Sequence, residues 1–137
     1  MPPDTLPPLG EAEIDRLVRA FYRRVRSDAL LGPIFNNAIQ DWDHHLGKLV
    51  DFWSSVMLGS GRYKGQPMAA HLRQATHMTP VAFERWLQLW GETTDVLLAP
   101  AAAAALQEKA ARIAESLGLG IAFHRERGLL GAAADAA

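Results

Sequence analysis

Two histidines of this chain lie in sequence contexts that suit a metal-centred cofactor. His45 belongs to a helical pattern that runs on into Phe-Trp, and His71 follows Gly65–Met68, with the sequence Gly-Gln-Pro-Met, by three residues. A neutral imidazole is a common iron ligand, and its second ring nitrogen usually donates to a carbonyl, which fixes the tautomer. The phenol of Tyr22 and the indole of Trp86 each offer a directed hydrogen-bond donor on an apolar body. These residue types favour a pocket around a bound metal centre over a plain helical core.

Each of these residues also has an ordinary structural interpretation. His45 can be a core-edge histidine that bonds a backbone carbonyl, and His71 can lie on the surface. His77 is an alternative to His71 as ligand, although it falls in a link between predicted helices, which fixes a side chain less firmly than a helix does. Tyr22 and Trp86 can be core residues only. The functional interpretation rests on their occurring together, because two hydrogen-bond donors, Tyr22 and Trp86, and an imidazole can converge on one cavity.

Helical geometry separates the adjacent histidines 44 and 45. Steps of four, seven and eight from His45 reach apolar residues: Leu49, Phe52 and Trp53. The same steps from His44 reach two polar residues and one apolar residue: Lys48, Asp51 and Phe52. We therefore expect His45 to face the interior and His44 to face solvent or the rim of a pocket.

The elements that must position these residues are all predicted to be helices, so the fold class is all-α. Apolar residues recur at spacings of three and four, and no strand-length alternation appears. Glycine, proline and capping residues divide the chain into its predicted elements. Long helices are expected over about 11–26, from 41 or 43 to 57, over 80–98 and over 101–117, with a short helical turn at 33–35 and a short helix opened by Pro67. We expect the last helix to end at Gly118 and Gly120.

Length and composition are those of one globular domain. The 137 residues are 49% hydrophobic, and we expect an extended proline-rich arm at 1–10, a domain at 11–127 and a flexible tail at 128–137. The net charge of −1 gives no support to a nucleic-acid or membrane partner, and no apolar run is long enough to cross a bilayer. The absence of cysteine excludes disulfides and thiolate metal sites and fits a cytoplasmic location, as does an N-terminus without a secretory pattern.

The chain resembles the truncated haemoglobins, in particular their third group. The resemblance covers about residues 14–117, and Gly-Gln-Pro-Met followed closely by His is a specific marker. The segments that carry it are Phe21-Tyr22, Leu31–Asn36, His45 with Phe52-Trp53, Leu58–Tyr63, Gly65–Met68, His71 and Phe83–Leu87. It implies a truncated globin fold, a two-over-two helical sandwich around haem b. The haem would be held non-covalently, since the chain has no cysteine for covalent attachment.

The resemblance also implies roles for individual residues. His71 matches the proximal iron ligand. Three residues match the polar groups on the opposite, distal side, where a gas ligand would bind: Tyr22, His45 and Trp86. Four residues are expected to contact the haem, the lysine through a propionate: Phe35, Lys48, Leu49 and Trp86. The segment 73–77 departs from the family pattern.

The implied function is reversible binding of O₂, NO or CO at a five-coordinate iron. Distal donors would slow ligand release, because a hydrogen bond to a charged group contributes about 1.5–3 kcal/mol. Slow release would suit NO dioxygenase or peroxidase-like chemistry, for which an unidentified reductase must supply electrons. His45 could gate the pocket, bind the ligand or act as a sixth ligand.

Two other functions remain open from the sequence. One is a cofactor-free helical interaction module. The other is a metal hydrolase that uses His45, His71 and Asp51, although the chain lacks the His-x-x-x-His spacing that puts two ligands on one helical face.

Overall fold

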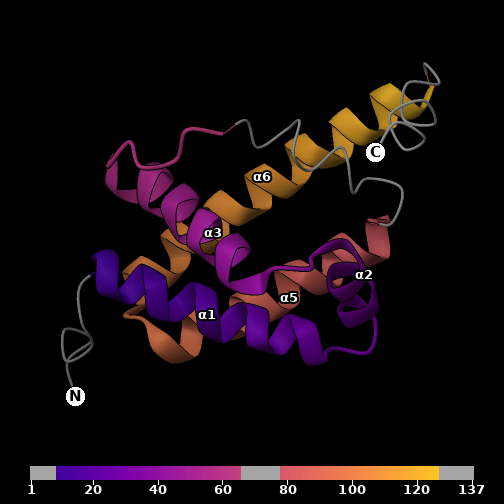
Figure 1. Ribbon diagram of the computed structural model, residues 1–137. Coiled ribbons are helices and arrows are strands. Elements are labelled where there is room, and N and C mark those ends of the chain that lie inside the picture. Colours follow the sequence, from indigo (N-terminus) through magenta and orange to yellow (C-terminus); the bar gives the residue numbers. More distant parts are fainter. Residues whose placement is uncertain (1–8, 66–77, 127–137) are drawn as a thin grey trace.

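The computed structural model describes residues 9–65 and 78–126 of the chain (Figure 1). These residues form the helices α1 (Glu11–Ser27), α2 (Leu31–Ala38), α3 (Trp42–Leu58), α5 (Pro80–Leu97) and α6 (Pro100–Glu126). No strand occurs within the described ranges, which confirms the prediction of an all-α chain. Residues 1–8 of the predicted arm at 1–10, the helix after Pro67 and the predicted tail lie outside the described residues.

Helix α1 forms because its apolar residues recur on one face. The residues buried along that face are Ile14, Leu17, Val18, Phe21, Tyr22 and Val25. Arginines occupy the opposite face and are exposed: Arg16, Arg19, Arg23, Arg24 and Arg26. Burial of one apolar stripe stabilises a helix more than its intrinsic propensity does, and this stripe includes the phenol predicted to lie in the site.

Capping side chains set the beginnings of the two helices that flank the predicted site. Asp41 accepts a hydrogen bond from the backbone N–H of His44 at 3.1 Å and so caps α3. Thr79 accepts from Ala82 N at 3.2 Å and caps α5, with Pro80 in the first turn. Helix α3 ends at Gly59, whose φ of 66° is in the left-handed region that favours glycine. The sequence predicted each of these boundaries.

Helix α2 is longer than the predicted turn at 33–35. It begins at Leu31 because the Asp28 carboxylate accepts hydrogen bonds from the backbone N–H groups of Leu30 and Leu31, at 3.1 and 3.0 Å. Those amides have no partner inside a helix, so a carboxylate at this point stabilises an early start.

The predicted end of the last helix at Gly118 and Gly120 is wrong, because α6 continues through both to Glu126. Among the described residues, positive φ values occur only at Gly59 and Gly61, so neither glycine of α6 adopts the left-handed conformation that ends a helix. Glycine inside a helix costs about 1 kcal/mol relative to alanine, which this long alanine-rich helix tolerates.

The helices pack as two pairs in two layers. Helix α1 packs on α3, and α5 packs on α6, while contacts between α1 and α5 join the pairs. Figure 1 shows α6 continuing beyond the other helices toward the C-terminus. Within the α5–α6 pair, the indole of Trp90 is fully buried and donates to the backbone carbonyl of Leu106 at 3.1 Å. No helix in the described ranges is long and apolar enough to cross a membrane.

Candidate functional site

The predicted site residues come from four helices. The structure places Tyr22 on α1, Phe35 on α2, Trp86 on α5, and three residues on α3: His45, Lys48 and Leu49. The predicted proximal ligand, His71, and its alternative, His77, lie outside the described residues. The described site residues are therefore those predicted for the distal side and for contacts with the haem.

Tyr22 lies in a buried, aromatic environment. Its side chain is 4% exposed, and its ring contacts those of Phe35 and Trp42 at centroid distances of 6.0 and 6.1 Å. Burial raises the pKa of the Tyr22 phenol to about 12, against a smaller opposing effect of its hydrogen bond with Trp86. The phenol is therefore neutral at any physiological pH and keeps its proton available for donation.

Trp86 is the hydrogen-bond partner of this phenol. The bond lowers the pKa of Tyr22 and therefore favours the phenolate form. The indole N–H has this effect when it donates to the phenol oxygen. Such a bond leaves the O–H of Tyr22 free to point elsewhere. The Trp86 ring is held edge-on by Phe21, at 5.7 Å and 80°, and parallel to Trp90, at 6.1 Å and 7°. The structure thus brings together the two donors that the sequence predicted to converge.

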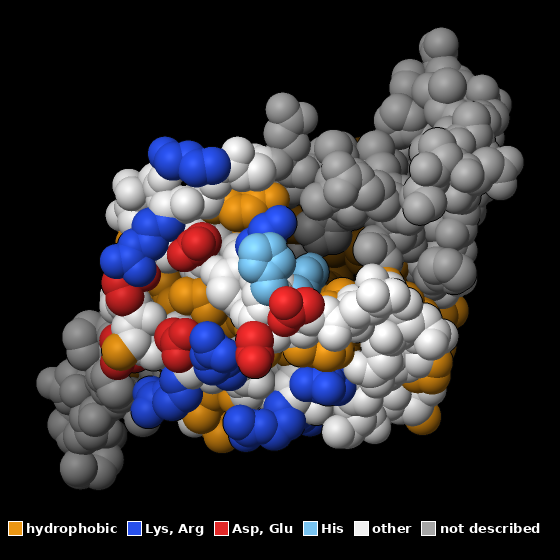
Figure 2. All heavy atoms as spheres, viewed as in Figure 1, with side chains coloured by type: hydrophobic (Ala, Val, Ile, Leu, Met, Phe, Trp, Pro, Cys, Tyr) orange, Lys and Arg blue, Asp and Glu red, His pale blue; other side chains and the backbone are white. Residues whose placement is uncertain are grey.

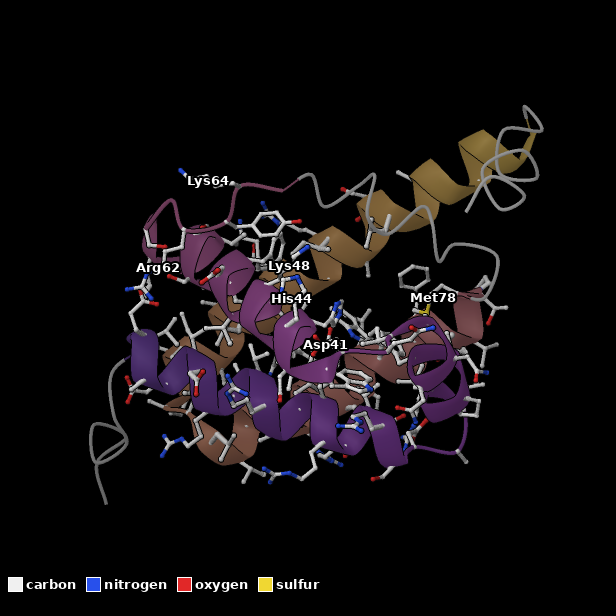
Figure 3. All side chains as sticks on the ribbon, in the orientation of Figure 1. Asp41, His44, Lys48, Arg62, Lys64 and Met78 are labelled. Atoms are coloured by element: carbon white, nitrogen blue, oxygen red, sulfur yellow. The ribbon has the colours of Figure 1, made fainter. Side chains whose placement is uncertain are left out.

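The two adjacent histidines face different environments, as their positions on the helix predicted. His45 is half-buried, and its ring meets the edge of Trp42 at 5.9 Å and 90°. His44 is exposed, and Figure 3 shows it with Lys48 on successive turns of α3. Lys48 is exposed like His44, whereas His45 is half-buried.

The apolar residues near these donors are packed on the core without being fully covered by it. Half-buried hydrophobic side chains come from α2, α3, α5 and a position two residues before α5: Phe35, Leu49, Phe52, Met78, Trp86 and Leu87. Figure 2 shows the surface hollowed beside the pale blue histidine side chains, with hydrophobic side chains within the hollow. A flat apolar ring system with a few polar groups fits such an environment. The residues present therefore fit haem.

A separate hollow of about 500 Å³ is lined by residues of α1, α2 and α3. Its lining consists of Arg19, Tyr22, Arg23, Arg26, Ser27, Asn36 and Leu46. Three guanidinium groups and no histidine make this lining unlike a haem pocket, in which apolar contacts dominate. This hollow therefore does not fit haem.

The hydrolase alternative gains no support from the geometry. Among the described residues, no group of three or more histidine, aspartate or glutamate side chains is placed to hold a metal ion. His45 and Asp51, two of the three ligands that this alternative requires, are therefore not part of a carboxylate–histidine cluster there.

Sequence reasoning missed an ion pair that positions two elements of the site. Arg85, adjacent to Trp86 on α5, donates to one oxygen of Asp28 from Nη2 at 2.7 Å and from Nε at 2.9 Å. The Arg85 hydrogen bond holds the pKa of the Asp28 carboxyl below its usual value of 3.8. An aspartate just before a helix signals a cap, but no local pattern indicates a partner 57 positions away.

Comparisons with known proteins agree with the fold. The family model of the bacterial-like globins matches residues 9–115. A group 3 truncated hemoglobin of Campylobacter jejuni is 39% identical over 93 residues, which cover 65% of this chain and 72% of that protein. The crystal structure of a group III truncated hemoglobin from Campylobacter jejuni superimposes with a TM-score of 0.71 at 35% identity, covering 80% of this chain and 89% of the other.

These matches span the helices that carry Tyr22, Phe35, His45 and Trp86, and they account for the two-over-two packing. Haem binding, with a diatomic gas such as O₂ as ligand, follows from the family. The chain belongs to the bacterial-like globins and, within them, to the group III truncated haemoglobins.

Proposed function

We propose that this globin binds haem b non-covalently through His71 and retains O₂, NO or CO with hydrogen bonds from the distal side. Family membership supports the haem and a gas ligand. The absence of cysteine supports a non-covalent cofactor and a reducing, cytoplasmic location. His71 is the proposed protein ligand in the state that binds the gas, in which the iron would be five-coordinate before the gas binds.

The observation that carries the proposal is the pairing of the Tyr22 phenol with the Trp86 indole. Haem, when bound, supplies an iron that takes up a diatomic gas and polarises it, so that partial negative charge develops on the gas. Tyr22 is buried, neutral and supplied with a donor at its oxygen, so its own O–H is available to the gas. A donor that is fixed in advance stabilises developing charge without reorganising.

The size of this effect favours retention over delivery of the ligand. A hydrogen bond to a charged group contributes about 1.5–3 kcal/mol, and about 1.4 kcal/mol changes an equilibrium tenfold. The Tyr22 bond alone would therefore slow release by at least about tenfold. Trp86 strengthens it, because a hydroxyl that accepts a hydrogen bond is a better donor.

The remaining residues exclude water and hold the cofactor in place. Phe35 and Leu49 supply half-buried apolar surface for the ring, and Lys48 supplies a cation at the rim for a propionate. His45 is half-buried with its ring against Trp42, which suits three roles: a gate, a second donor to the gas and a sixth iron ligand.

Retained ligand gives time for reaction with a second molecule. Slow release supports NO dioxygenase or peroxidase-like turnover, and repeated turnover requires an external electron donor, so we propose a reductase partner. The chain itself offers binding and orientation, while the cofactor supplies the redox chemistry.

Spectroscopy of the purified protein tests the proposal. The expected preparation is red, and its main haem absorption band shifts when CO is added to the reduced protein. In stopped-flow measurements, Tyr22→Phe is expected to release O₂ at least about ten times faster, because one charge-assisted hydrogen bond is lost. Tyr63→Phe, the other tyrosine of the chain, is the matched control and should leave the rate unchanged.

Two results would overturn the proposal. A colourless protein that takes up no added haemin would favour the cofactor-free module. A His71→Ala variant that keeps the wild-type spectrum would move the proximal ligand elsewhere, with His77→Ala as the next variant to measure.

A further inference from the structure

Three of the four tryptophans form a continuous stack that begins at the proposed gas site. The rings of Trp86 and Trp90 are parallel within 7° at a centroid distance of 6.1 Å. Those of Trp90 and Trp53 lie at 4.6 Å and 22°. Trp90 and Trp53 are 0% and 2% exposed, so the stack leads from the site into the core and across from α5 to α3.

Aromatic contacts continue from the stack to a phenol near the surface. The ring of Trp53 meets that of Phe52 at 5.5 Å and 84°, and Phe52 meets Tyr63 at 5.4 Å and 90°. Tyr63 is half-buried in the loop after α3, where its backbone N–H donates to Ser55 Oγ at 2.8 Å. The row of rings Trp86, Trp90, Trp53, Phe52 and Tyr63 is called the aromatic row below.

The members of this row differ in how they can take part in electron transfer. Indoles and phenols are the side chains most easily oxidised by one electron, whereas the phenyl ring of Phe52 serves only as a bridge. The Trp90 N–H donates to the Leu106 carbonyl at 3.1 Å, and an amide carbonyl is too weak a base to remove the proton. An oxidised Trp90 therefore keeps its proton and passes its charge on. Tyr63, which is half-exposed, can release its proton to water.

We propose that the aromatic row carries oxidising equivalents from the haem site to Tyr63, where a soluble reductant removes them. This proposal rests on the proposed haem site next to Trp86. It adds to that site a path that protects the pocket when peroxide is the oxidant. Electrons move inward from Tyr63 through Phe52, Trp53 and Trp90 as the charge moves outward.

The reaction balances with hydrogen peroxide as oxidant and an enediol or thiol as reductant. Peroxide accepts two electrons and two protons and becomes two molecules of water. Each electron leaves the Tyr63 phenol, whose proton passes to solvent and leaves a neutral phenoxyl radical. The reductant returns one electron, solvent returns the proton, and a second passage along the row supplies the second electron.

A competing route through Tyr22 to Trp42 is less favourable. The two rings are 6.1 Å apart and inclined at 46°, so they overlap less than the stacked indoles. Oxidation of a phenol requires loss of its proton, but Tyr22 is buried and its partner Trp86 acts as a donor. The raised pKa of Tyr22, about 12, reflects the same resistance to deprotonation.

Peroxide treatment of the haem-loaded protein tests the path. The sample is frozen after mixing, radicals are assigned by electron paramagnetic resonance with ring-deuterated tryptophan or tyrosine, and oxidised side chains are located by peptide mass spectrometry. The wild type is expected to carry its radical on Tyr63. Tyr63→Phe should remove that signal and raise oxidation of the Trp53 and Trp90 indoles several-fold.

Trp90→Phe removes an oxidisable ring from the row while keeping an aromatic ring in the core, so the charge must cross from Trp86 to Trp53 in one longer step. It should abolish most of the Tyr63 radical and shift oxidation to Trp86 and Tyr22. Trp53→Phe provides the same interruption at another point if the first variant folds poorly. Trp42→Phe, which changes the one tryptophan outside the stack, is the matched control and should leave the Tyr63 radical unchanged.

The outcomes separate this proposal from the proposed function. A protein whose haem band shifts with CO, but whose Tyr63 radical survives both Trp90→Phe and Trp53→Phe, overturns the path and leaves the gas site intact. A radical that forms on Tyr22 and Trp42 in the wild type does the same. Failure to bind haem overturns both proposals.

Discussion

Asp28 and Arg85 are joined by an ion pair in which each carboxylate oxygen serves a different element. Oδ1 accepts from Arg85 Nη2 at 2.7 Å and Nε at 2.9 Å, and Oδ2 accepts from the backbone at the beginning of α2. The Asp28 side chain is 7% exposed and that of Arg85 is 35% exposed. The pair thereby fixes α2, which carries Phe35, relative to the turn of α5 that carries Trp86.

Asp28→Ala is expected to lower the free energy of unfolding by about 2 kcal/mol, since it removes a helix cap and leaves a partly buried guanidinium without its partner. Urea unfolding at neutral pH measures this change. Arg19→Ala is the matched control, because it breaks an ion pair with Asp15 whose side chains are 44% and 46% exposed. That variant should stay within about 0.5 kcal/mol of the wild type.

Acid should remove the same contribution from the wild type. The pKa of Asp28 is lowered in the folded state, chiefly by the Arg85 hydrogen bond, so the stabilisation is complete above its usual value of 3.8. It is lost as the pH falls through the lower pKa of the folded protein. The stabilities of Asp28→Ala and the wild type should therefore converge in strong acid. A constant gap between the two curves would contradict this.

Alkaline pH should also lower the stability, through Tyr22, whose pKa is shifted in the opposite direction to that of Asp28. Its folded-state pKa is raised from 10.0 to about 12, so the protonated phenol stabilises the fold fully below pH 10.0 and progressively less as the pH approaches about 12. The shift corresponds to about 2–3 kcal/mol, at about 1.4 kcal/mol per unit.

Unfolding measurements between neutral pH and about pH 12 detect the loss of this contribution in the wild type. Tyr22→Phe has no ionisable group at this position and should lose less stability over the same range. Tyr63→Phe retains Tyr22 and should behave like the wild type. Equal losses in all three proteins would show that the Tyr22 phenol ionises as freely as one in water.

Tyr22 and Trp86 should act on the gas ligand as one unit. The indole donates to the phenol oxygen, so removing Trp86 weakens the O–H bond that Tyr22 gives to the ligand. Tyr22→Phe, Trp86→Phe and the double variant form a double-mutant cycle of O₂ dissociation rates. The combined effect should fall short of the product of the single effects, by a coupling of about 0.5–3 kcal/mol. A multiplicative result would mean that each donor acts on the ligand by itself.

Much of this arrangement could be predicted from the sequence where the cause is local. The buried face of α1 follows from the spacing of its apolar residues, and the beginnings of α3 and α5 follow from Asp41 and Thr79 as caps. The orientation of His45 and His44 follows from helical geometry alone. Each of these features depends on residues within about two turns of a helix.

The features that could not be predicted depend on contacts between distant residues. The Asp28–Arg85 pair and the stack of Trp53 on Trp90 join helices whose relative placement no local pattern specifies. The sequence predicted that Tyr22 and Trp86 converge, and an indole N–H can only donate to a phenol oxygen, but the bond itself depends on how α1 and α5 pack. The role of His71 stays a prediction.

The end of α6 supplies a prediction that separates the observed helix from the expected stop. Gly118 lies inside α6, its φ is not positive, and an added Cβ would meet no heavy atom within 4 Å. Gly118→Ala should therefore raise the free energy of unfolding by about 0.5–1 kcal/mol, because alanine favours the helix and restricts the unfolded chain.

Gly32→Ala is the contrasting variant. Its Cβ would lie 2.8 Å from the Arg26 carbonyl oxygen, so it should destabilise the protein. If Gly118→Ala also destabilised the protein in thermal and urea unfolding, the helix would end in a left-handed glycine at 118, as the sequence alone predicted.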